Sequence, residues 1–243
     1  PCPRAKREGE ATAGLALDLP EACQPRPAID PLRPFSLWKF NTMQMLIVIS
    51  IGGAAALAAY LRWLRPWQLR WGATDEEVAR PMPGDDVVER PTFNATRAIT
   101  VNAKSEDIWP WLVQIGVQRA GWYSYDWVDN LGRPSAERIL PEFQNLKVGD
   151  LIPISPDGKQ GLWVKDMDPS RWLLWWDKKG DTTWLWALYP LDERHTRLIT
   201  RVRMRYDWLS PSIIFNLLLD VGDIVMMRKC MLGIQRRAEA LAH

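Results

Sequence analysis

The longest apolar run in the chain covers residues 44–61 and contains no charged side chain. The nearest charges are Lys39 and Arg62, which leaves 22 uncharged positions between them. A helix rises about 1.5 Å per residue, so such a run reaches roughly 30 Å, the thickness of the hydrocarbon core of a bilayer. Tryptophans flank the run as in the aromatic belts of membrane proteins, at Trp38, Trp63, Trp67 and Trp71. We therefore predict one transmembrane helix over residues 43–65.

Two other interpretations of this run stay open. Small residues at 54–56 and 56–58 match the cleavage site of a secretory signal peptide, although the apolar run continues past them to Leu61. A buried core helix is disfavoured because nothing charged or strongly polar interrupts the run. The pattern favours a single-pass protein of the cell membrane.

The segment before the run, residues 1–42, contains seven prolines, mixed charges and no apolar period. This composition is typical of a disordered tail. One hypothesis is that the natural chain starts at Met43. Arg62, Arg65 and Arg70 would then place the following domain in the cytoplasm by the positive-inside rule, whereas with the tail included the basic residues on the two sides balance.

After the run, residues 66–95 are polar and contain several prolines, so we expect a linker there and a folded domain over residues 96–243. Alternation at 96–101 predicts a strand. Ser105, followed by two acidic residues, predicts the start of a helix that ends at Gly116. Two short helices are expected at 127–131 and 135–140.

From Leu146 onward the period changes to that of strands, separated by short links that carry Pro, Asp and Gly. This pattern predicts an antiparallel meander. The expected strands cover residues 150–154, 161–165, 172–177, 182–189 and 196–206. In the last of them Arg201, Arg203 and Arg205 would face water, while the alternating Val202, Met204 and Tyr206 face inward.

The end of the chain predicts one long helix that begins at Ser210, with Pro211 at its first position. Its apolar residues recur at three- and four-residue steps and give it one apolar face: Ile224, Met227, Met231, Ile234, Ala238 and Leu241. The run 213–219 is too short to span a bilayer, and core packing is the favoured interpretation over contact with a membrane surface. Asp220 and Asp223, three apart, are expected on a solvated face.

The composition of the chain excludes several classes of function. The formal net charge is +2, without a basic stripe, so no nucleic-acid partner is expected. The three cysteines form no C-x-x-C, Cys230 fits a small buried position, and there are only two histidines. No metal site, cofactor motif or catalytic motif is predicted. The unusual feature is the presence of 15 tryptophans, which either fill the core or line a cavity.

Four sequence segments resemble membrane-anchored bacterial members of the SRPBCC, or START-like, superfamily (polyketide cyclase/dehydrase and lipid transport). They are WPWLVQIG (109–116), GWYSYDW (121–127), LKVGDLIP (146–153) and MLGIQRRAE (231–239). The resemblance implies an α+β helix-grip fold, in which a curved antiparallel sheet wraps around the long C-terminal helix and encloses an apolar cavity. No catalytic motif is shared across that superfamily, so no catalytic residue is transferred to this chain.

Within such a fold, aromatic and methionine side chains are the candidates for lining the cavity, with plain core packing as the alternative. The candidates are Tyr123, Tyr125, Trp127, Trp163, Trp175, Trp184, Trp186, Met227 and Met231. Trp184 and Trp186 share one face of their strand, but the alternation does not say which face looks inward.

Three functions follow from this picture. The first is a membrane-anchored binder or carrier of a lipid or other hydrophobic small molecule. The second is a cyclase- or dehydratase-like enzyme, with Tyr125 and Asp126 as acid–base candidates, although helix capping explains Asp126 and Asp129 as well. The third is a structural subunit of a membrane complex, with its cavity filled by side chains.

Overall fold

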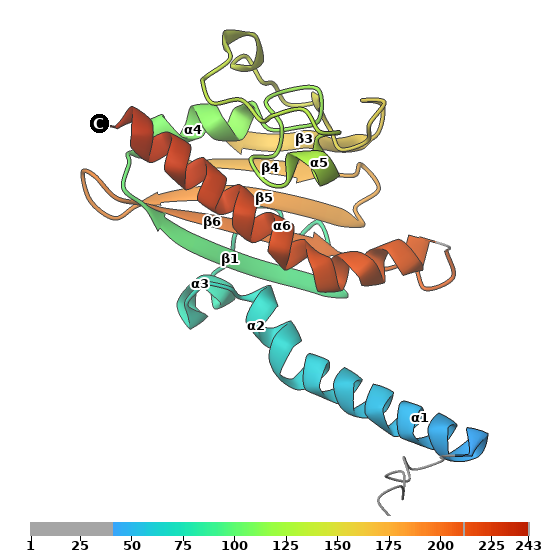
Figure 1. Cartoon of the computed structure of the whole chain (residues 1–243). Coiled ribbons are helices and arrows are strands. Elements are labelled where there is room, and N and C mark those ends of the chain that lie inside the picture. The colour runs from blue at the N-terminus through green and yellow to red at the C-terminus, as the bar shows by residue number, and fades with distance from the viewer. Residues whose placement is uncertain (1–40, 211, 243) are drawn as a thin grey trace, which may run out of the picture. The chain divides into compact units, whose positions relative to one another are not determined.

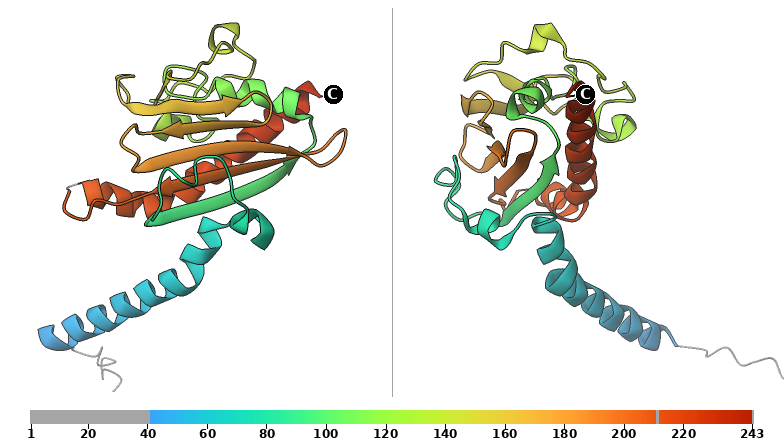
Figure 2. Two further views of the ribbon diagram at one scale, coloured as in Figure 1. Left: turned by 180° about the vertical axis from the view of Figure 1, so that it is seen from behind. Right: turned by 90° about the vertical axis from the view of Figure 1, so that its left-hand side faces the viewer.

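The computed structural model describes residues 41–210 and 212–242, and it is an α+β helix-grip fold (Figure 1). A six-stranded antiparallel sheet has the order β1-β6-β5-β4-β3-β2. The strands are β1 (Phe93–Val101), β2 (Leu151–Pro153), β3 (Gly161–Asp168), β4 (Trp172–Trp176), β5 (Thr182–Pro190) and β6 (Thr196–Met204). The long helix α6 (Ser212–Leu241) lies across one face of this curved sheet (Figures 1 and 2).

The predicted meander is confirmed, since each of the strands from β2 to β5 pairs with the next strand along the chain. β1 pairs with β6 at the edge of the sheet. Helix α4 (Ser105–Val113) and the single turn α5 (Asp126–Asp129) lie near their expected positions. The helix expected at 135–140 is wrong. That stretch is irregular, and only a short 3-10 turn, η3 (Pro141–Phe143), follows it.

The main core lies between the sheet and α6. The inward face of α6 matches the predicted one from Ile224 to Ala238, and Cys230 is buried with it, but the prediction for Leu241 is wrong because that side chain is 54% exposed. Gly233 allows a close approach, because a Cβ there would collide with the backbone oxygen of Tyr123. At this point the backbone of α6 therefore packs directly against the backbone of the segment before α5.

The opposite face of the sheet is also covered, by the segment that the sequence suggested was a linker. Residues 66–95 contain α2 (Arg65–Leu69) and α3 (Asp75–Ala79), whose first turn has a capping box between Thr74 and Glu77. Met82 packs against the outward side chains of the sheet, and Val88 is fully buried. This segment is thus a layer of the fold, as the edge-on view in Figure 2 shows.

This layer corrects the expectation for the arginines of β6. Arg201 is only 4% exposed. Its guanidinium donates to the backbone oxygens of Glu77 (2.8 Å), Val78 (3.0 Å) and Arg80 (2.9 Å) and pairs with Asp85 at 2.6 Å.

Arg203 also turns to this layer, where it donates to the backbone oxygen of Val88 at 2.8 Å. Arg205 is half exposed and pairs with Asp181, as a surface arginine does. The alternation of β6 was predicted correctly, but the face opposite α6 is not a water-facing one.

Helical residues run without a break from Thr42 to Leu69, through α1 (Thr42–Ala59), the π-helical turn η2 (Tyr60–Leu64) and α2. The π turn has a local cause, because Pro66 cannot donate a hydrogen bond and its ring clashes with the carbonyl four residues earlier, so the backbone widens there.

The apolar part of this helix is long, and none of its most apolar stretch is buried. This is one helix long and apolar enough to cross a membrane.

The chain divides into two compact units, Pro1–Gly52 and Gly53–His243. Of the first unit only residues 41–52 are described, and they are almost entirely helical. The expectation of a disordered tail falls on residues outside the described part. The second half of the apolar helix belongs to the unit that contains the sheet.

We predict that Arg201→Met lowers the free energy of unfolding by about 3 kcal/mol, because Asp85 loses its shorter ion pair and the backbone oxygens of three residues of the covering segment lose a donor. Arg205→Met is the matched control, and the loss of its exposed pair should cost less than about 1 kcal/mol. Thermal melts of the full chain in detergent micelles would show the difference. Equal losses for the two variants would contradict a structural role for residues 66–95.

Candidate functional site

Four indole rings form one cluster in the core that α6 covers. Trp184 stacks on Trp122 with ring centroids 5.6 Å apart, and its edge contacts Trp175 at 5.2 Å. Trp186 lies 5.4 Å from Trp184 and 6.4 Å from Trp175. We call Trp122, Trp175, Trp184 and Trp186 the indole cluster. Such edge-on and stacked arrangements are those that aromatic rings prefer.

Strand register explains why these rings meet. Trp175 of β4 lies directly opposite Trp184 of β5, and side chains two apart on a strand share a face, so Trp186 joins them. The neighbouring Leu174 and Leu185 point to the opposite face, where they pack with residues 66–95. The question that the sequence left open is thereby answered: Trp184 and Trp186 face α6.

The indole N–H groups of these rings differ in whether they have a hydrogen-bond acceptor. Trp184 donates its indole N–H to Thr200 Oγ1 at 2.9 Å. The indole nitrogens of Trp175 and Trp186 are buried and have no hydrogen-bond partner among the described residues, and the same is true of Trp111. A buried donor without an acceptor costs about 1–3 kcal/mol. The cluster therefore holds two donors that suit an acceptor atom.

Five of the nine candidate side chains are buried in this core, and Trp184 is half-buried beside them. Tyr123 is 3% exposed, accepts from Gln114 Nε2 at 2.8 Å and donates to the Trp111 carbonyl at 3.2 Å. Burial raises the pKa of Tyr123. The others in the core are Trp175, Trp186, Met227 and Met231. Their role in lining a ligand site stays a prediction.

The other three candidates lie away from the cluster. Trp127 on α5 is 79% exposed. Lys178 lies over the ring of Trp163, with Nζ 3.1 Å from the centroid, and Lys229 lies over the ring of Tyr125 at 3.8 Å. These rings meet cations at the surface, so they do not bear on the interior site. Sequence reasoning missed Trp122, although it lies inside the GWYSYDW segment.

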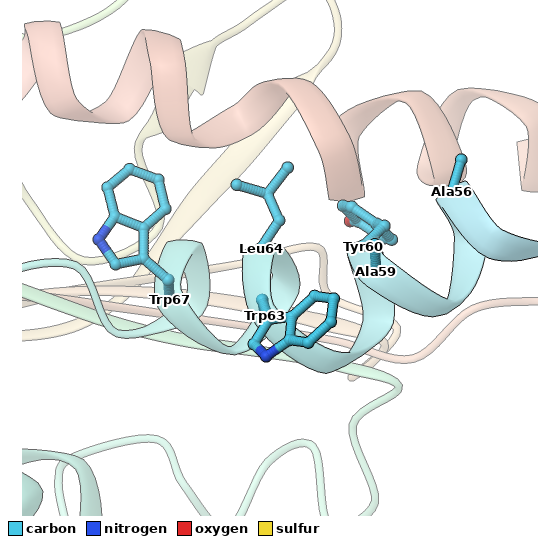
Figure 3. Close-up of a pocket in the computed structure, with 6 residues that line it drawn as sticks. All are labelled: Ala56, Ala59, Tyr60, Trp63, Leu64 and Trp67. Atoms are coloured by element: carbon cyan, nitrogen blue, oxygen red, sulfur yellow. The ribbon is translucent and has the colours of Figure 1, made fainter.

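The deep apolar cavity that the resemblance implies is occupied by side chains here. Trp175, Trp186 and Met231 are fully buried in that space. Two hollows lie elsewhere, one near the end of α6 beside Trp111 and the other on the apolar helix. The latter is lined by Ala56, Ala59, Tyr60, Trp63, Leu64 and Trp67 (Figure 3).

Two carboxylates flank the covered core at α5. Asp126 accepts a hydrogen bond from Ser135 Oγ at 2.5 Å, and neither acid caps the helix through its side chain. Both carboxyl oxygens of Asp129 are buried, and within the described residues no contact to them has full hydrogen-bond geometry, although the Ser124 hydroxyl and the Tyr125 backbone are close enough to oppose the rise of its pKa. Burial, together with the neighbouring charge of Asp126, raises the pKa of Asp129.

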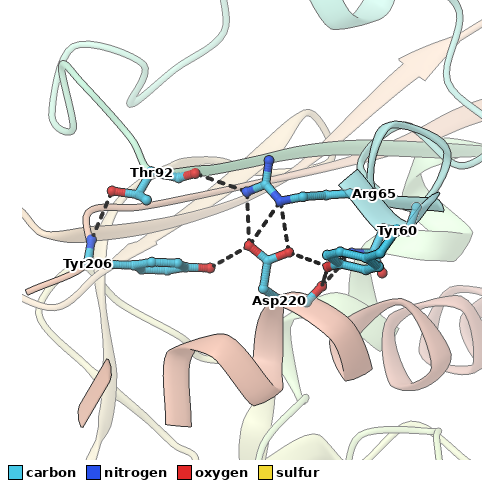
Figure 4. Close-up of polar contacts among 6 residues, drawn as sticks. Tyr60, Arg65, Thr92, Tyr206 and Asp220 are labelled. Carbon is cyan, nitrogen blue, oxygen red and sulfur yellow. Dashed lines mark hydrogen bonds and ion pairs between the residues drawn. The ribbon is translucent and has the colours of Figure 1, made fainter. Parts of the chain in front are cut away.

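A second polar constellation joins α6 to the apolar helix, and we call it the Asp220 junction (Figure 4). The Asp220 carboxylate accepts hydrogen bonds from Tyr60 Oη at 2.7 Å, Arg65 Nη2 at 2.9 Å and Tyr206 Oη at 3.0 Å. Gln68 Nε2 donates to the Asp220 backbone oxygen at 2.5 Å. The expectation that Asp220 faces solvent is therefore wrong.

Asp223 is turned inward in the same way. It pairs at 2.5 Å with Arg97, whose side chain is 1% exposed and also donates to the backbone oxygen of Gln68. Burial raises the pKa of Asp220, but the hydrogen bonds from Arg65 and Tyr60 outweigh it, and the net pKa is lowered. The junction therefore holds a carboxylate that stays charged at neutral pH.

Comparison with known proteins gives structural matches only. No protein-family model matches the chain, and no curated protein matches it. A Polyketide_cyc-like protein from Corynebacterium glutamicum is 15% identical with a TM-score of 0.39, over 61% of this chain and 92% of that one. A Thermobifida fusca protein is 16% identical with a TM-score of 0.39, over 62% and 95%. An Arthrobacter aurescens protein is 14% identical with a TM-score of 0.35, over 67% and 92%.

We predict that Asp220→Asn lowers the free energy of unfolding by roughly 3 kcal/mol at neutral pH, because Arg65 loses its counter-ion. The folded pKa of Asp220 is depressed, so its contribution is present above the unfolded value of about 3.9 and is lost as pH falls through the folded pKa. Melting temperatures of both proteins between neutral pH and pH 3 would therefore converge on acidification. A gap that is independent of pH would contradict this assignment.

Proposed function

We propose that this protein is a membrane-anchored binder or carrier of a hydrophobic small molecule, held between the sheet and α6 against the indole cluster. The observation that carries the proposal is the pair of buried, unpartnered indole N–H groups of Trp175 and Trp186. Small-molecule sites are largely apolar with a few placed polar groups, and this cluster has that composition. The ligand class is an apolar molecule that carries one or two acceptor oxygens.

The cover over the cluster suits a site that opens for its ligand. Met227 and Met231 lie in the same core as the indole rings, and methionine side chains repack around irregular shapes more easily than branched ones. Binding would replace side-chain contacts with ligand contacts and would satisfy the two donors.

The anchor gives the proposed function its location. The helix from Thr42 to Leu69 is apolar enough to cross a bilayer, and Arg62, Arg65 and Arg70 lie at its domain end. Counted without residues 1–42, these arginines favour a cytoplasmic domain under the positive-inside rule, whereas with those residues counted the basic residues on the two sides balance. A carrier fixed there is close to the membrane, where apolar molecules reside.

We predict that native mass spectrometry of the full chain, after gentle detergent extraction, detects a co-purifying apolar molecule. Trp186→Phe keeps an aromatic ring but removes the donor, so affinity for that molecule should fall up to about tenfold, the value of one hydrogen bond. Trp172→Phe is the matched control, since Trp172 packs on the opposite face of the sheet. Equal binding by all three proteins would contradict the site.

A cyclase- or dehydratase-like activity is the second candidate, favoured by Asp129 alone. A buried carboxyl with a raised pKa is a group that can hold a proton for general acid catalysis. We predict that Asp129→Asn abolishes turnover of a bound substrate without weakening its binding, whereas Tyr125→Phe leaves turnover unchanged because that ring is engaged with Lys229. Turnover by Asp129→Asn at the parent rate would rule out this role.

The third candidate, a structural subunit of a membrane complex, needs no ligand at all. The packed indole cluster agrees with it as well as with a closed carrier. The extraction experiment separates the two, because a structural subunit would carry no small molecule and would instead retain protein partners. We favour the carrier because core packing alone leaves two indole donors unsatisfied.

A further inference from the structure

The outward face of the first turns of α6 is entirely apolar. Ile214 and Leu218 are 68% and 67% exposed, and three further residues are about half exposed, namely Leu217, Val221 and Val225. Steps of three and four residues place all five on one side of a helix. We call them the α6 stripe. Among the described residues from 214 to 225, Gly222 is the only other exposed one.

This stripe overturns the expectation that the run 213–219 packs into the core. A helix on the surface of a water-soluble protein normally shows polar side chains outward. Here the two acids of the region point the other way, since Asp220 pairs with Arg65 and Asp223 pairs with Arg97. The outward face is left without a charge, which favours contact with an apolar medium.

The loop before α6 also carries exposed apolar side chains. Trp208 is 62% exposed and Leu209 is 98% exposed. Trp208 is supported by an edge-on contact with Tyr206, whose ring centroid is 6.0 Å away. An indole beside an exposed leucine is a common pairing at the boundary between lipid and water.

The Asp220 junction places this surface beside the apolar helix. Tyr60 and Arg65 of that helix bond directly to Asp220, in the middle of the stripe region of α6. The apolar helix is itself exposed there, with Trp63 at 68% and Trp67 at 54%. Both belong to the compact unit that begins at Gly53, so two uncovered apolar surfaces meet at one ion pair.

We propose that the α6 stripe, with Trp208 and Leu209, lies in the interfacial layer of the bilayer that the helix Thr42–Leu69 crosses. This inference rests on the anchoring in the proposed function. Apolar side chains at this depth gain about 25 cal/mol for each Å² removed from water. α6 then contacts lipid with the outer face of its first turns, and the inner face of its later turns covers the indole cluster.

Site-directed spin labelling of the full chain in lipid nanodiscs tests this placement. Leu218→Cys and Leu209→Cys report on the proposed surface. Leu191→Cys is the matched control, because Leu191 is 59% exposed in the turn between β5 and β6. Cys2 and Cys23 are replaced by serine, and Cys230 is kept because it is buried and its thiol pKa is raised.

Labels at 218 and 209 should collide with oxygen and be shielded severalfold from a water-soluble nickel chelate, whereas the label at 191 should show the reverse. Chelate access at 218 equal to that at 191 would overturn the proposal. Spin–spin broadening at 218 that disappears on dilution with unlabelled protein would assign the stripe to a second copy, and would overturn it too.

An alkaline carbonate wash of native membranes separates this inference from the anchoring itself. If the chain is washed off, the anchor fails and the placement of the stripe fails with it. If the chain is retained while the label at 218 is open to the chelate, only the placement of the stripe fails. The co-purified ligand, measured separately, bears on the carrier function in either case.

Discussion

The packing of α6 depends on the burial of one carboxylate, that of Asp220. Asp220 lies on a helix that is apolar on both sides, and a buried carboxylate is tolerated only when donors surround it. Tyr60 and Arg65 supply donors from the apolar helix, and Tyr206 supplies one from the segment after β6. Their convergence fixes the rotation of α6, because the turn that points Asp220 inward also points Val221 and Leu218 outward. One ion-pair network therefore decides which apolar residues enter the core and which remain uncovered.

Arginines give the sheet its second covered face by the same principle. Arg201 and Arg203 of β6 would be surface residues on a sheet with one solvated side, but residues 66–95 offer them backbone oxygens and Asp85. Each guanidinium has several donors in a fixed plane, which suits the carbonyls of an irregular segment. Polar contacts thus hold residues 66–95 on the sheet, although their sequence has no regular periodicity. The apolar contacts of Met82 are added to these.

Sequence periodicity predicted the parts of the fold where burial follows the backbone repeat. The strands and the inner face of α6 belong to this class, since Met227 and Met231 recur with the helical period. Periodicity could not show that residues 66–95 are packed, because their buried residues lie on loops. Periodicity also assigned the side chains of β5 to two faces, but it could not show which face α6 covers. It missed Trp122 because that residue lies in a segment without a regular repeat. The α6 stripe was missed because an apolar run favours burial, and only the partners of Asp220 and Asp223 reveal its exposure.

The indole cluster and the α6 stripe both depend on how α6 is attached to the sheet. α6 must stay attached to the sheet to bury Trp175 and Trp186, yet a ligand can reach these rings only if α6 or the α5 region yields. At its N-terminal end α6 is fixed by the Asp220 junction and by the Arg97 pair, so that end resists opening. Farther along, the inward residues are Met227 and Met231, which adapt by rotamer change and need no helix displacement. In the proposed carrier, an arrangement that is rigid at the junction and adaptable over the rings would let a ligand exchange without displacing α6.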